Sequence, residues 1–231
     1  MPRPPYISFP PDPTLQAAIQ ECLERYDVGD PGAEWPNNIL STKAVIYTSG
    51  RIARKGEPVT HQVDPDELDL IKRLAHDALK VVAGVSVGMG SSASDPFREF
   101  YSAANMNEEH PEKIDEALIR ARFGGTIFPP ATISVEPFAE SGTWWSEVVA
   151  DGEGDGKYLY PWRNVIHWFR TQPDFVDAAF VRIGDSELLA QLDDSDCPPG
   201  TKLPGCVLPR LALGLTKQGS LAGLFGYSVQ G

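Results

Sequence analysis

Three residues in the second half of the chain have the types and spacing of an anion-binding site. Arg163, His167 and Arg170 stand at positions i, i+4 and i+7 of a segment with a helical pattern, so their side chains follow one stripe of that helix. Arginine offers paired hydrogen bonds to a carboxylate or phosphate, and histidine exchanges protons near neutral pH. The stripe predicts an anionic ligand, with His167 as the candidate catalytic residue. Pairing with the protein's own acidic loops is the simpler explanation of the same residues.

A second candidate site is the glycine- and serine-rich segment Gly88–Ser94, which precedes a predicted helix. Glycines let a ligand approach the backbone, and amides at a helix N-terminus favour a phosphate, here with Ser91 and Ser92 as binding residues. Over these seven residues the segment resembles the phosphate loop of the GHMP small-molecule kinases, whose core reads Gly-Leu-Gly-Ser-Ser-Ala. The resemblance implies phosphate binding. We favour a connector between two helices, because Asp95 adds a negative charge and the family's further motifs are absent.

An acidic segment has the opening of a calcium-binding loop. Asp151, Glu153 and Asp155 occupy relative positions 1, 3 and 5, and Gly156 follows at position 6, as in an EF-hand loop. Position 12 is Trp162 in place of the bidentate glutamate, so the ligand set is incomplete. We expect an acidic tip between two strands and no metal site; these three carboxylates are the candidate ligands if a metal does bind.

Aromatic residues gather in the segment 144–168, which holds four of the five tryptophans. Together with Glu136, Glu140 and Glu147 they suggest stacking on a sugar or heterocycle beside paired carboxylates. Core packing is the interpretation that we favour, because one face of the predicted helix is apolar throughout. That face holds Trp162, Val165, Ile166 and Phe169.

The remaining histidines and the cysteines indicate no further motif. His61, at the end of a strand-like segment, is a candidate base, but no motif supplies a nucleophile for it. His76 lies on the polar flank of a predicted helix beside Lys72, and we expect it to be solvated. Cys197 and Cys206 flank a turn-rich loop, where a disulfide competes with two ordinary thiols. No spacing typical of a transition-metal site or of a named cofactor occurs, so the cofactor is unassigned.

The composition limits the classes of function. The 231 residues are 42% hydrophobic and 23% charged, which is typical of one globular domain. A net charge of −12 repels phosphate backbones and anionic lipids, so we expect neither nucleic-acid nor membrane-surface binding. The sequence has no apolar stretch long enough to cross a bilayer and no secretory signal at its start. We therefore expect a soluble cytoplasmic protein.

Helices are expected mainly in the first half of the chain. Residues 1–13 are rich in proline and are predicted to form an extended arm, followed by a single domain over 14–231. Asp64, Pro65 and Glu67 have the pattern of an N-cap, a first-turn proline and the third-position glutamate of a capping box. Helices are predicted over 14–26, 65–82, 96–104 and 111–123. Thr14 is the expected cap of the first, Asp95-Pro96 repeats the cap-then-proline start before the third, and Gly124-Gly125 should stop the fourth.

Strands are expected mainly in the second half. They are predicted over 126–136, 144–150, 178–183, 207–216 and 221–229, with one inserted helix near 161–172. A hairpin or two short strands are also predicted within 41–62, and residues 217–220 should turn the last hairpin. The sequence therefore predicts an α+β fold, with helices mainly in 14–123 and a mostly antiparallel sheet built mainly from 126–231.

Two functions fit these observations. Our leading hypothesis is a protein that binds a small molecule carrying a carboxylate or phosphate, in a pocket where strands meet helices. The sequence does not decide whether catalysis follows. The alternative is a non-catalytic subunit or adaptor, in a homo-oligomer or a hetero-complex. It would pair through the proline-rich arm and the apolar edge of the last strand.

Overall fold

The fold is α+β, as predicted, and its centre is a six-stranded antiparallel sheet. The computed structural model describes residues 9–24, 34–35, 39–57, 61–83, 93–94, 96–139, 156–199 and 207–229. The sheet order is β3–β8–β7–β6–β5, and β4 also pairs with β8. The sheet strands are β3 (Ala93–Ser94), β4 (Arg98–Ser102), β5 (Ile133–Pro137), β6 (Phe175–Ile183), β7 (Val207–Thr216) and β8 (Leu221–Val229).

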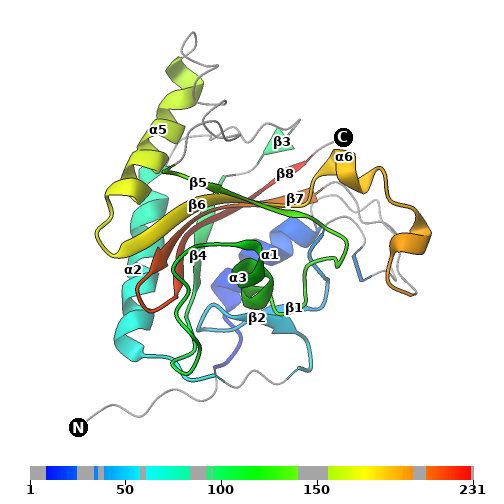
Figure 1. Ribbon diagram of the computed structural model, residues 1–231, viewed down its shortest axis with the longest axis horizontal. Helices are drawn as coiled ribbons and strands as arrows, with labels where there is room; N and C mark the ends of the chain where they lie inside the picture. The colour runs from blue at the N-terminus through cyan, green and yellow to red at the C-terminus, as the bar shows by residue number, and fades with distance from the viewer. Residues whose placement is uncertain are drawn as a thin grey trace.

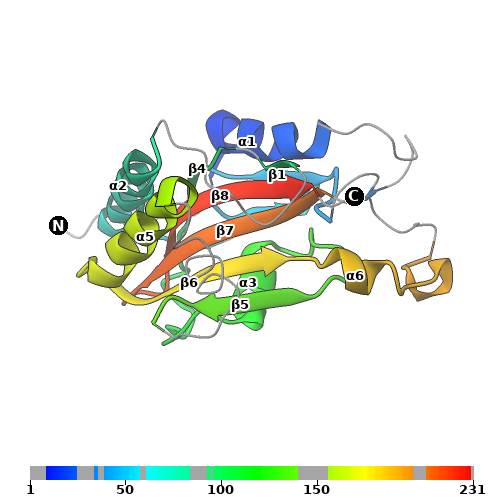
Figure 2. The same ribbon diagram turned by 90° about the horizontal axis from the view of Figure 1, so that it is seen from above.

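Helices and a small hairpin cover the two faces of this sheet (Figures 1 and 2). In Figure 1, α5 lies above the sheet, whereas α3 and the β1–β2 hairpin lie below it. The helices are α1 (Pro13–Glu24), α2 (Pro65–Val81), α3 (Glu116–Arg122), α5 (Gly156–Thr171), α6 (Ser186–Leu189) and the 3-10 turn η2 (Asp194–Asp196). The hairpin strands are β1 (Ala44–Ile46) and β2 (Ile52–Arg54).

The helix α5 packs through an aromatic face. Trp162 and Phe169 are almost fully buried, and the Phe169 ring stacks on Phe175 with centroids 5.7 Å apart. Trp162 meets Phe180 of β6 edge-on at 5.1 Å. Core packing of this segment is therefore confirmed for the described residues. The helix begins earlier than predicted, at Gly156.

The start of α2 agrees with the predicted cap in two of its three parts. The Asp64 side chain accepts a hydrogen bond from the Asp66 amide at 3.0 Å, and Pro65 opens the helix. Glu67 does not play the expected capping-box role. Its carboxylate is buried and accepts a hydrogen bond of 2.5 Å from the Thr216 hydroxyl of β7. The glutamate therefore ties the helix to the sheet, because a buried carboxylate needs a partner more than an exposed helix end does.

The helix predicted over 96–104 is wrong, because this segment forms the strand β4. Phe97 and Phe100 have helical spacing, yet they pack on different sides. Phe97 meets Trp162 of α5, whereas Phe100 stacks between Phe123 and Phe225. Five residue pairs join β4 to β8. The local Asp-Pro helix signal is overridden by this pairing, since a weak propensity yields to tertiary contacts.

The position of β8 also contradicts the edge that the adaptor hypothesis requires. This last strand is paired on one side with β7 and on the other with β3 and β4. Every described residue of β8 is buried. Other strands therefore pair with β8 on both sides, so it is not an edge strand of the sheet.

Residues 9–12 lie against the domain and lead into α1. Phe9 is buried, and Pro11 forms a β-bridge with Tyr47. The helix cap is Asp12, where the sequence suggested Thr14. Its Oδ1 accepts hydrogen bonds from the amides of Thr14 and Leu15 at 2.9 and 3.0 Å.

The other predicted elements are placed as follows. The helix predicted over 111–123 begins at Glu116, capped by Asp115, and ends before Gly124 and Gly125, both at positive φ. The predicted hairpin within 41–62 and the turn at 217–220 are confirmed. The strand predicted over 126–136 is confined to β5, and the strand predicted over 144–150 lies outside the described residues.

Candidate functional site

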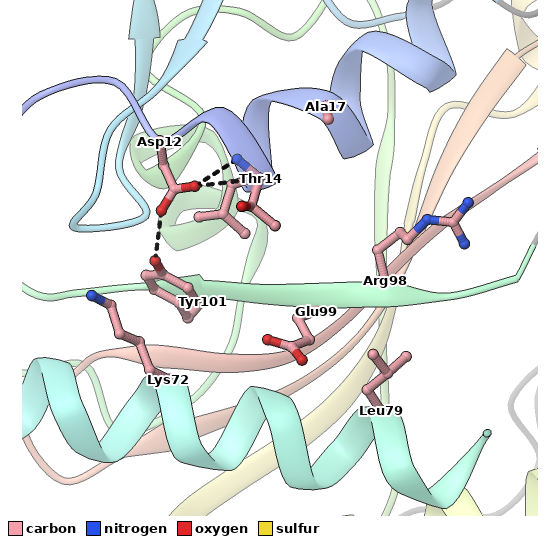
Figure 3. Close-up of a pocket in the computed structure, with 9 residues that line it drawn as sticks. Asp12, Thr14, Ala17, Lys72, Leu79, Arg98, Glu99 and Tyr101 are labelled. Atoms are coloured by element: carbon pink, nitrogen blue, oxygen red, sulfur yellow. Dashed lines mark hydrogen bonds between the residues drawn. The ribbon is translucent and has the colours of Figure 1, made fainter.

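A cavity of about 540 Å³ lies between α1, α2 and the sheet strand β4. Figure 3 shows α1 and α2 on either side of β4, with side chains from all three directed into the space between them. The lining contains two cations, two carboxylates, a tyrosine and several apolar groups. These residues are Asp12, Thr14, Leu15, Ala17, Lys72, Leu79, Arg98, Glu99 and Tyr101.

The periodicity of each element explains which side chains reach the cavity. On β4, Glu99 and Tyr101 are two residues apart and therefore point to the same face. On α2, Lys72 and Leu79 are seven residues apart and share one stripe of the helix. The cavity therefore requires β4 to be a strand. A helix over the same residues would separate Glu99 from Tyr101.

Asp12 and Tyr101 close one wall of the cavity. The Tyr101 hydroxyl donates a hydrogen bond to Asp12 Oδ2 at 3.1 Å, while Oδ1 caps α1. Burial, together with the nearby Asp12 carboxylate, raises the pKa of Tyr101 well above its usual range. Tyr101 is therefore a neutral donor at physiological pH, and both oxygens of Asp12 are used within the protein.

Lys72 contributes a cation to the same wall. Its Nζ lies 5.6 Å from the centroid of the Tyr101 ring, in the geometry of a cation–π contact. Within the described residues, Lys72 forms no ion pair. Arg98 brings a second cation, whose guanidinium donates to the Pro96 carbonyl at 3.1 Å. The ammonium of Lys72 is therefore available to an acid group in the cavity.

Glu99 is held in place by His76 of α2. His76 Nδ1 and Glu99 Oε1 are 2.7 Å apart, with half-exposed side chains. His76 was expected to be solvated, and it is instead the partner of a cavity carboxylate. The contact fixes the orientation of Glu99 and leaves its second oxygen without a hydrogen bond from the residues that the structure describes.

The candidate base His61 contacts a serine hydroxyl that no sequence motif indicated. Its Nε2 lies 2.8 Å from the Ser49 hydroxyl, and both residues are buried. Burial and the charge of Arg51 lower the pKa of His61 to about 4, so the ring is neutral near pH 7. Ser49 lies in the β1–β2 turn, where its carbonyl accepts a hydrogen bond from the Ala103 amide. Neither His61 nor Ser49 lines the cavity.

The predicted anion stripe on α5 lies away from this cavity. Arg163, His167 and Arg170 are all exposed on the helix face opposite to the aromatic one. None of the three lines the cavity between α1, α2 and β4. Ligand binding by this stripe stays a prediction.

Several other predicted site residues lie outside the described part of the chain. These are Ser91 and Ser92 of the glycine-rich segment, the candidate metal ligands Asp151, Glu153 and Asp155, and the carboxylates Glu140 and Glu147. Glu136 is described; it is buried and forms an ion pair with Arg182 Nε at 2.6 Å. Cys197 is a free thiol.

The described residues contain no cluster of three or more histidine, cysteine or carboxylate side chains suited to a metal. Among the helices that the structure describes, none has both the length and the apolar character needed to cross a bilayer.

Sequence reasoning missed the cavity because its residues come from three separate segments. Asp12 and Tyr101 are 89 positions apart, and no local spacing relates them. One available signal was the alternation of Glu99 and Tyr101, which the Asp95-Pro96 helix signal concealed. A second was the polar flank of α2, where Lys72 and His76 stand four residues apart.

Comparison with known proteins gives a partial similarity. No protein-family model matches the chain. It is 29% identical to the biotin synthase of Shewanella sediminis over 102 residues, which are 44% of this chain and 26% of that enzyme. It is 28% identical to a biotin synthase of Aliivibrio fischeri over 112 residues, 48% of this chain and 29% of the enzyme. The matched part thus spans less than a third of these enzymes.

Proposed function

We propose that this protein binds a small organic anion, a carboxylate or a phosphate, in the cavity between α1, α2 and β4. The observation that carries the proposal is the Lys72 ammonium, which stands over the Tyr101 ring and has no carboxylate partner among the described residues. An acid group of a ligand would complete this arrangement with a charge-assisted hydrogen bond.

The size and chemistry of the cavity support the same function. Ligand pockets typically enclose about 300–1,000 Å³ and combine apolar walls with a few convergent polar groups. This cavity has about 540 Å³, with Leu15, Ala17 and Leu79 among its apolar residues. Such walls suit an aliphatic body beside the charged groups.

The partial similarity to biotin synthases agrees with this class of ligand. Those enzymes are named for making biotin, a small molecule with a carboxylate at the end of an aliphatic chain. Biotin is therefore a reasonable probe, although the matched segment is too short a part of the enzyme to carry its activity over to this chain.

The test compares matched probes with and without an acid group. Hexanoate, biotin and glycerol 3-phosphate are set against hexanol, biotinamide and glycerol, and binding is measured by thermal shift and by calorimetry. A ligand at 100 times its dissociation constant stabilises the folded state by about 2.7 kcal/mol. We expect at least one acid probe to raise the melting temperature, and its neutral counterpart to have a smaller effect.

Variants assign the effect to the cavity. Lys72→Met should weaken binding of the acid probe roughly 10- to 100-fold, because a hydrogen bond to a charged group contributes about 1.5–3 kcal/mol. Lys80→Met is the matched control, since Lys80 lies on the same helix, is exposed and pairs with Asp77. The proposal is wrong if no acid probe binds, or if the two variants bind the probe equally well.

A further inference from the structure

The cavity between α1, α2 and β4 has a second charged wall that a simple anion would not satisfy. Glu99 points into the same space as Lys72 and Tyr101 (Figure 3). A carboxylate beside a bound anion is repulsive, and the low polarity of the walls would increase that repulsion. The ligand must therefore carry a group that binds the Glu99 carboxylate as well as a group that binds the Lys72 ammonium.

The two carboxylates of the lining differ in how many of their oxygens accept hydrogen bonds from described residues. Both oxygens of Asp12 accept hydrogen bonds within the protein, from two amides of α1 and from the Tyr101 hydroxyl. Glu99 uses only Oε1, at 2.7 Å from His76 Nδ1. Its second oxygen keeps its capacity to accept. Of the two, Glu99 is the carboxylate that can receive a ligand.

Among the described residues, the ionisable side chain in contact with Glu99 is His76, and neither Lys72 nor Arg98 pairs with it. Within the described residues, Lys72 and Glu99 form no ion pair with each other, although both line the cavity. Arg98 also lines the cavity, but in the described part of the chain no ion pair joins it to Glu99. The Glu99 carboxylate and the Lys72 ammonium thus line one cavity without contacting each other.

We propose that the ligand is a zwitterion, an amino carboxylate whose acid group binds Lys72 and whose ammonium group binds Glu99. The inference rests on the proposed binding of an anion at Lys72 and adds the chemistry of the other end. His76 acts as a positioning residue, because its contact with Oε1 restrains the Glu99 carboxylate. The aliphatic part of such a ligand would lie along Leu79 and Leu15.

The experiment uses ω-amino carboxylates with three to seven methylene groups and the unsubstituted carboxylates of matching length. Calorimetry measures each dissociation constant for the full-length protein. We expect the best amino carboxylate to bind at least ten-fold more tightly than its unsubstituted counterpart. In Glu99→Gln this ratio should fall to about one. The unsubstituted acid should bind the variant as tightly as wild type or more tightly, because a repulsive charge has been removed.

Glu57→Gln is the matched control, because Glu57 is exposed and does not line the cavity. The zwitterion is excluded if both ligand types bind wild type equally, or if Glu99→Gln retains the preference; the proposed anion binding would then still stand. If neither ligand type binds, both proposals fail. A circular dichroism spectrum and a melting curve of each variant confirm that it folds, and the ratio of two ligands on one variant is unaffected by its stability.

Discussion

The helix α5 and the cavity between α1, α2 and β4 differ in how far their charged groups are exposed. Beneath α5 the packed cluster is wholly apolar, and its charged residues Arg163, His167 and Arg170 stay exposed. Around the cavity, charged and polar groups from three elements converge and are partly buried. The proposed site therefore differs from the α5 stripe in that its charged groups line a concave surface, where one ligand can contact several of them.

The largest expected effect concerns the aromatic side of α5. Phe169→Ala should lower the free energy of unfolding by about 3–5 kcal/mol, because it leaves a cavity among the rings of Phe138, Trp168 and Phe175. His167→Ala, on the exposed face of the same helix, should change it by less than about 0.5 kcal/mol. Urea unfolding measures both. Equal losses would show that the outer face also contributes to packing.

The second effect is a dependence of stability on pH that arises at His61, which contacts Ser49 of the β1–β2 turn. Burial of His61 favours the neutral ring, so the pKa is about 4 in the folded state against an ordinary value of 6.5. The unfolded chain therefore binds the proton more readily between these values. The contribution of His61 to the free energy of unfolding is fully present above pH 6.5. It is lost as the pH drops toward 4, by up to about 3 kcal/mol.

Unfolding curves between pH 4 and 8 test this expectation. In His61→Gln the part of the slope that His61 contributes should disappear, whereas His110→Gln should follow wild type because His110 is exposed. If wild type and both variants lose stability equally with falling pH, His61 contributes nothing to the pH dependence.

The third effect concerns the wall formed by Asp12 and Tyr101. Asp12→Ala removes the cap of α1 and the partner of the tyrosine, and should cost about 2 kcal/mol. Tyr101→Phe removes only the hydroxyl contact and should cost about 1 kcal/mol. The double variant should lose less than the sum of the two, since both single variants break the same bond. Strict additivity would indicate that this hydrogen bond contributes nothing to stability.

The smallest expected effect tests the two regions directly against each other. Arg163→Gln combined with Arg170→Gln should alter the affinity for an acid probe less than two-fold, because exposed charges are screened by salt. Lys72→Met should weaken the same affinity about ten-fold or more. Calorimetry with one probe compares the two variants. A greater loss in the double arginine variant would instead assign the anion site to the predicted stripe on α5.

The parts of the fold that were predictable depend on local patterns. The cap at Asp64, the apolar stripe of α2, the glycine stop after α3 and the last hairpin follow from residues near one another in sequence. The strand β4 was not predictable in this way. The Asp95-Pro96 signal favours a helix locally, and the pairing with β8 that overrides it joins residues more than a hundred positions apart.

The candidate site residues also fall into those that local spacing relates and those that only tertiary packing brings together. The sequence alone determined that Arg163, His167 and Arg170 share one helix face and that Trp162 and Phe169 share another, because helical periodicity relates residues within two turns. Only the tertiary structure decided that Asp12, Lys72, Glu99 and Tyr101 line one cavity. Their convergence depends on β4 being a strand beside β8 and on α1 and α2 lying on either side of it. Long-range packing sets that arrangement, and spacing along the chain does not encode it.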